Sequence, residues 1–74
     1  MKYHYTHVCV VVDQGTRITI TWYDANENAI CTGDAVVTGS SEAIENYVPS
    51  LASRIKNSHT ELFYQGDAED EVTD

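Results

Sequence analysis

Histidine and cysteine are the residue types of this chain that could support metal or nucleophilic chemistry, and their spacing argues against a metal. His4 and His7 are three residues apart on a predicted strand, so they point to opposite faces and cannot bind one ion. His7 and Cys9 share a face, but together they supply only two ligands. The sequence therefore predicts no metal site and no cofactor.

The sequence lacks the residue patterns that usually accompany nucleophilic catalysis. A cysteine nucleophile needs a neighbouring histidine and an oxyanion hole, and a helix N-terminus activates it further. Cys9 and Cys31 lie instead inside predicted strands. There is no glycine-rich phosphate loop, nucleophile elbow or calcium-binding loop. We expect no enzyme activity, and two free thiols, buried or half-buried, with a bridge between neighbouring strands as the alternative.

Residues 40–57 form the one segment with a sustained helical period. Spacings of four, three and four place its apolar residues in one stripe: Ile44, Val48, Leu51 and Ile55. Ser40 or Ser41 can cap the N-terminus of this helix. Pro49 removes a hydrogen bond inside the segment, so the helix either kinks or divides into two pieces. We favour one kinked helix, because the stripe continues through Pro49.

Strand patterns occupy most of the remaining chain. Alternating, β-branched and aromatic residues predict strands at residues 2–13, 17–23, 29–38 and 60–65. Gly33 suggests a bulge or the close approach of another backbone. The predicted fold class is α+β: a four-stranded, mainly antiparallel sheet in the order β-β-β-α-β, with one helix packed on one face and the last strand beside the first. Residues 1–65 form a single domain, and residues 66–74 an acidic tail expected to be disordered.

The strand alternation predicts which side chains the helix covers. The residues expected beneath the helix are Val8, Val10, Val12, Ile18, Ile20 and Trp22. The residues expected on the uncovered face are Tyr3, Tyr5, His7, Cys9, Val11, Thr19, Thr21 and Tyr23. Tyrosine is enriched at interfaces, so this face is a candidate docking surface. The alternative is that its Tyr and Thr pairs only stabilise the sheet.

Charge is the strongest compositional signal. The 74 residues contain 12 acids and 4 bases, a formal net charge of −8. Such a charge repels nucleic acid and anionic membranes and attracts basic partners, although it also serves solubility alone. Lys2 and Arg17 are the only bases in the first half of the chain, so direct nucleic-acid binding is not expected. Without a signal peptide or an apolar run longer than residues 8–12, we expect a cytoplasmic protein.

In size, acidity and element order the chain resembles the small proteins that phages encode against host machinery, of which anti-CRISPR proteins are the best-known group. The resemblance covers most of the chain and rests on architecture, without a shared motif that would assign a role to a residue. It implies a stoichiometric inhibitor, acting in the host cell cytoplasm, that covers a functional surface of a nucleic-acid-handling complex.

The expected function is therefore non-catalytic binding of a basic host protein or ribonucleoprotein complex. The alternative is a small structural domain that forms a homodimer through the uncovered sheet face. The expected partner-binding residues combine the aromatic face with exposed acids: Tyr3, Tyr5, His7, Tyr23, Asp24, Glu27, Asp34, Asp67, Glu69, Asp70 and Glu71.

Overall fold

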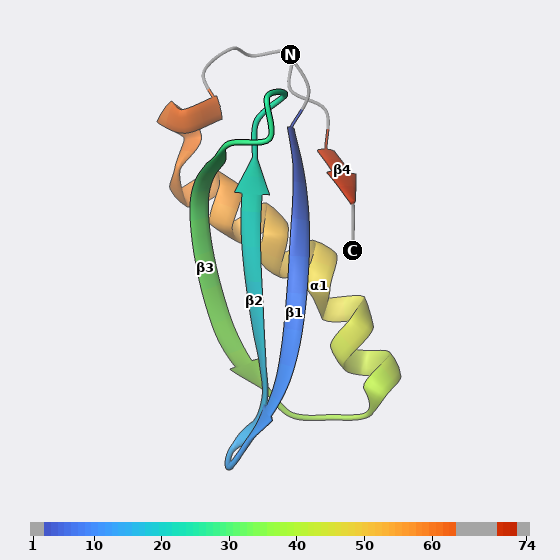
Figure 1. Cartoon of the computed structure of the whole chain (residues 1–74). Coiled ribbons are helices and arrows are strands. Elements are labelled where there is room, and N and C mark those ends of the chain that lie inside the picture. Colours follow the sequence, from blue (N-terminus) through green and yellow to red (C-terminus); the bar gives the residue numbers. More distant parts are fainter. Residues whose placement is uncertain (1–2, 64–69, 73–74) are drawn as a thin grey trace.

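A computed structural model describes residues 3–63 and 70–72 of the chain. One helix packs on one face of a single sheet, which confirms the α+β class (Figure 1). The elements in chain order are β1 (Tyr3–Val12), β2 (Gly15–Tyr23), β3 (Ala29–Val37), α1 (Ser41–Ser58), a 3₁₀ helix η1 (Thr60–Phe63) and β4 (Asp70–Val72). The strands lie in the order β3-β2-β1-β4, with the first three antiparallel and β4 parallel to β1.

The fourth strand predicted at residues 60–65 is wrong. Its described part is the 3₁₀ helix η1, which places the Phe63 ring edge-on against Tyr3 and Trp22, with centroid distances of 4.8 and 5.4 Å. Burial of this ring against the core competes successfully with strand pairing. A short strand is found instead at Asp70–Val72, inside the predicted tail 66–74, and the other residues of that tail lie outside the described part.

Helix α1 follows the predicted pattern closely. Ser40 caps it by accepting a hydrogen bond from the Ala43 N–H at 3.1 Å. The helix continues through Pro49 as one element, which confirms the preference for a single helix over two pieces. Its buried residues are Val48, Leu51, Ala52 and Ile55, with Ile44 partly buried.

The helix is held close to the sheet at two points. The Trp22 indole N–H, fully buried, donates to the Ala52 carbonyl at 3.0 Å. At Gly33, an added Cβ would lie 2.9 Å from Cδ1 of Ile55, closer than carbon atoms pack. The close approach at Gly33 is made by the Ile55 side chain of the helix and not, as predicted, by another backbone. The bulge lies where the register shifts between Trp22 and Tyr23, with Ile30 of β3 as the extra residue.

The predicted faces of β1 are wrong. Tyr3 and Tyr5 are 2% and 3% exposed and belong to the core, whereas Val8 and Val10 are exposed. Tyr5 pairs with Trp22, and residues directly opposite in an antiparallel pair share a face. The odd-numbered residues of β1 therefore lie on the same face as Ile18, Ile20 and Trp22, beneath the helix. The Tyr5 and Trp22 rings pack edge-on at 4.9 Å, burying more area than valines would.

Candidate functional site: the open face of the sheet

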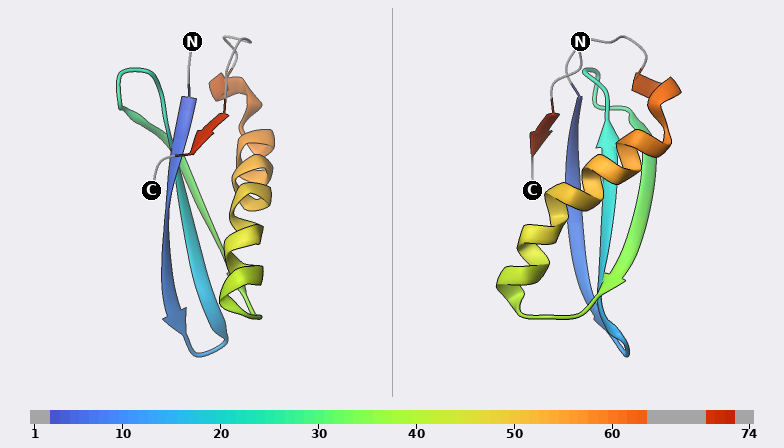
Figure 2. Two further views of the ribbon diagram at one scale, coloured as in Figure 1. Left: turned by 90° about the vertical axis from the view of Figure 1, so that its right-hand side faces the viewer. Right: turned by 180° about the vertical axis from the view of Figure 1, so that it is seen from behind.

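The face of the sheet opposite α1 has no second layer within the described residues, as the edge-on view in Figure 2 shows. We call it the open face. Strand register arranges it in cross-strand rows, which begin with His4 and Tyr23 at the β2–β3 loop and end near the β1–β2 turn. The open face comprises His4, Thr6, Val8, Val10 and Val12 of β1, Arg17, Thr19, Thr21 and Tyr23 of β2, and Thr32, Asp34 and Val36 of β3.

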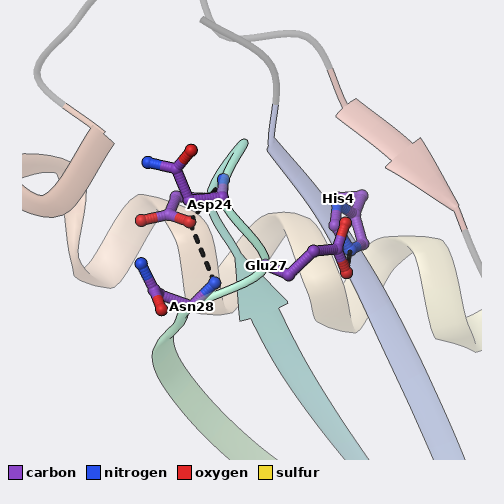
Figure 3. A network of polar contacts seen from close by, with 5 residues as sticks. His4, Asp24, Glu27 and Asn28 are labelled. Carbon is purple, nitrogen blue, oxygen red and sulfur yellow. Dashed lines mark hydrogen bonds and ion pairs between the residues drawn. The ribbon is translucent and has the colours of Figure 1, made fainter.

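One end of the open face is aromatic and acidic. The His4 ring stacks on Tyr23 with centroids 5.3 Å apart and an angle of 13° between planes. Glu27 approaches from the β2–β3 loop, with its Oε1 atom 3.5 Å from Nε2 of His4 (Figure 3). Glu27 has a φ of 66°, a left-handed conformation that is uncommon for glutamate. The loop therefore presents a carboxylate at this end of the open face.

Asp24 has a structural role in that loop. Its carboxylate Oδ1 accepts hydrogen bonds from the N–H groups of Asn26 and Asn28, both at 2.9 Å. This is an aspartate turn, in which the side chain replaces a backbone acceptor (Figure 3). The hydrogen bond from the Asn28 backbone, ahead of the one from Asn26, lowers the pKa of Asp24 below its usual value of 3.8. Asp24 stabilises the loop that carries Glu27.

Hydroxyl groups occupy the middle of the open face. The Thr32 hydroxyl donates to the Ile20 carbonyl at 2.8 Å, and its oxygen lies 3.1 Å from the Thr21 hydroxyl oxygen. In the next rows, Arg17 lies 3.9 Å from the Asp34 carboxylate, and both side chains are more than half exposed. Such an exposed pair contributes little to stability, and both groups remain available to a partner.

Aliphatic side chains dominate the far half of the open face. Val8, Val10 and Val36 are 58%, 52% and 43% exposed. Val10, Arg17 and Val36 occupy one cross-strand row, and Val8, Thr19 and Asp34 the row beside it. The face therefore combines a valine patch with a guanidinium and a carboxylate, the mixture of apolar area and polar groups found in protein–protein interfaces.

The predicted partner-binding residues divide between the two faces. Tyr3 and Tyr5 are in the core, and His7 lies on the helix side, so their assignment to an outer surface is wrong. Tyr23 and Asp34 do lie on the open face, as do Thr19 and Thr21. Asp24 and Glu27 are in its neighbouring loop. Asp70 and Glu71 lie in β4 opposite Tyr3 and His4, while Asp67 and Glu69 lie outside the described residues.

The valines of this face were missed by sequence reasoning, although the sequence contained the signal. Any turn with an even number of residues between β1 and β2 pairs odd positions of one strand with even positions of the other. With Ile18, Ile20 and Trp22 inside, Tyr5 must be inside and Val10 outside. The same correction moves Tyr3 and Tyr5 away from the face through which the homodimer alternative was expected, and leaves Tyr23 there.

Other groups offer little chemistry. Cys9 and Cys31 are free thiols, and Cys9 is exposed rather than buried. Burial, followed by the nearby Glu61 carboxylate, raises the pKa of the Cys31 thiol and so reduces its thiolate population. Within the described part of the chain, no group of at least three His, Cys, Asp or Glu residues lies close enough to hold a metal.

A cleft of about 240 Å³ lies between β3 and the second half of α1, lined by residues that include Asp34, Arg54 and His59. It is smaller than the sites that enclose most small-molecule ligands, roughly 300–1,000 Å³. The described residues therefore offer a surface for contact more readily than a cavity for a substrate.

No helix in the described part of the chain combines the length and apolar character needed to span a bilayer. Comparisons of the whole chain with protein-family models, curated proteins and solved structures give no match of any kind.

Proposed function

We propose that the chain is a non-catalytic binding protein that docks its open face on a basic surface of another protein. The observation that carries this proposal is a set of exposed valines on an uncovered sheet face, which we call the valine patch: Val8 and Val10 are neighbours on β1, and Val36 lies on β3 across Arg17. An antiparallel sheet with one solvated face ordinarily turns polar residues outward. Exposed apolar side chains gathered among polar groups on one face are typical of an interaction site.

Charge supports a basic partner. The chain has a net charge of −8, and Glu27 and Asp34 place carboxylates beside and within the open face. Complementary charge accelerates encounter and selects partners, while apolar contacts provide most of the affinity. An inhibitor of the anti-CRISPR kind, which covers a nucleic-acid-handling surface of a host complex, fits these requirements, because such surfaces are basic.

Binding measurements on the full chain test this proposal. The chain is immobilised, basic proteins from a host lysate are captured, and the dissociation constant of the purified partner is measured by calorimetry. We expect the dissociation constant to rise between about 50 and about 300 mM salt, because screening weakens charge attraction. We also expect Val36→Ser to raise it roughly tenfold, because Val36 is part of the patch.

Leu62→Ser is the matched control. Leu62 is an exposed apolar residue of η1, away from the open face, so its replacement should change the dissociation constant less than about twofold. Equal affinities for the wild-type chain and Val36→Ser would exclude the open face as the docking surface. A salt-independent dissociation constant would contradict the basic partner.

A further inference from the structure

We infer that the outer edge of β1 is an interface with a second copy of this chain, which pairs antiparallel through residues 8–12. β4 pairs with β1 only from Tyr3 to Tyr5, and no strand of the described residues pairs with the rest of that side (Figure 1). Backbone N–H and C=O groups on an uncovered strand edge form a template for another strand. This inference does not depend on the proposed function.

The composition of this edge distinguishes it from protected edges. Edge strands are ordinarily guarded by charges, proline or bulges, yet residues 8–12 read Val-Cys-Val-Val-Val. Four of these five residues are exposed, and Val11 is 84% exposed. The opposite edge of the sheet, β3, carries Asp34 and pairs with β2 across a bulge. The unguarded edge is therefore specific to β1.

A second copy fits this edge better than an unrelated chain, because the segment is complementary to itself. Antiparallel pairing centred on Val10 places Val8 opposite Val12 of the other copy on the open side. It places Cys9 opposite Val11 of the other copy on the helix side. Residues 3–12 form the longest stretch without Asp, Glu, Lys or Arg. In a chain of net charge −8, pairing through residues 8–12 brings no acidic side chain of β1 opposite another.

The helix supplies a second complementarity. Figure 2 shows α1 crossing the sheet diagonally, so that its first turns lie beyond the outer side of β1 in the view from behind. The same diagonal leaves Cys9 and Val11 exposed although they face the helix side. In the proposed dimer, a two-fold axis near Val10 relates the first turns of α1 and the exposed residues Cys9 and Val11 of one copy to those of the other. The first turns of α1 in each copy then lie over Cys9 and Val11 of the other copy.

The oligomeric state of the full chain tests the inference. Sedimentation equilibrium from about 10 µM to about 1 mM should show a monomer–dimer equilibrium. Sodium chloride should strengthen the dimer by screening repulsion between acidic copies, the opposite of its effect on binding to a basic partner. Val11→Lys should raise the dimer dissociation constant at least about 100-fold, because each interface would bury two lysines. Circular dichroism verifies that this variant folds.

Val36→Lys is the matched control, since Val36 is an exposed valine on the other edge strand and should leave the dimer intact. In a Cys31→Ser background, a short bis-maleimide should link Cys9 to Cys9 of the second copy, because diagonal neighbours in such a pair lie about 7–8 Å apart. A wild-type chain that stays monomeric, including one that binds only another protein's strand, overturns the inference. So does a dimer that survives Val11→Lys or is lost in Val36→Lys.

Discussion

At the residue scale, Asp24 shows how one ionised group specifies a loop. Its carboxylate pKa is lowered from 3.8 by backbone hydrogen bonds, so its contribution to stability is fully present above that value. The contribution is lost as pH falls through the lower pKa of the folded state. We therefore expect the stability difference between the wild-type chain and Asp24→Ala to shrink between about pH 5 and about pH 2. Urea unfolding at a series of pH values measures it.

Asp24→Asn separates the acceptor from the charge. An asparagine oxygen can accept the same hydrogen bonds from Asn26 and Asn28, but it does not titrate. This variant should keep more stability than Asp24→Ala at every pH, and its difference from Asp24→Ala should not vary with pH. A wild-type curve parallel to that of Asp24→Ala across the acid range would contradict the role given to the carboxylate.

At the element scale, the distance between β3 and α1 depends on Gly33. An alanine Cβ there would lie 2.9 Å from Cδ1 and 3.0 Å from Cγ1 of Ile55, so the helix or the Ile55 side chain must move. We expect Gly33→Ala to lower the free energy of unfolding by about 1–3 kcal/mol, the usual cost of overpacking. Chemical denaturation measures this loss.

A second substitution identifies the cause. Ile55→Val removes the Cδ1 atom that an alanine at position 33 would meet, so the double variant should lose less than the sum of the two single variants. Strictly additive losses would show that Gly33→Ala acts through the backbone of β3 and not through the helix contact.

Periodicity was enough to predict most elements of this fold. The first three strands and the capped helix follow from local patterns of apolar residues and serine. The fourth strand was predicted in the wrong place because the neighbouring apolar residues Leu62 and Phe63 are compatible with two structures. They could belong to a strand that pairs in the sheet, or to a segment that buries the Phe63 ring against Tyr3 and Trp22. That choice is made by contacts distant in sequence, such as the Phe63–Tyr3 pair.

At the scale of the whole molecule, one misassigned strand face changed the candidate site from tyrosines to valines. Local alternation gives β1 two faces but does not say which one the helix covers. The β1–β2 register decides this, because it pairs Tyr5 with Trp22. The candidate site was therefore predicted only in part. Tyr23 was expected on the uncovered face and lies there, whereas placing Val8 and Val10 there requires the β1–β2 register as well as the alternation within β1. Val36 follows from the β2–β3 register, which a bulge interrupts.

The strongest test of this arrangement compares tyrosines from the two faces. Tyr5 is 3% exposed and packs on Trp22, whereas Tyr23 lies on the open face against His4. Tyr5→Ala should cost about 3–5 kcal/mol, as removal of a buried aromatic ring does, and Tyr23→Ala about 1 kcal/mol or less.

Small domains have only about 5–15 kcal/mol of stability in total, so Tyr5→Ala should unfold at a much lower urea concentration than the wild-type chain. Tyr5→Phe keeps the ring and should recover most of the loss, which separates packing from the hydroxyl group. A larger loss of stability for Tyr23→Ala than for Tyr5→Ala would show that the helix covers the other face of the sheet, the face shared by Tyr23 and the even-numbered residues of β1. It would return the valines to the core and remove the basis for both the open-face interaction and the pairing of two β1 edges.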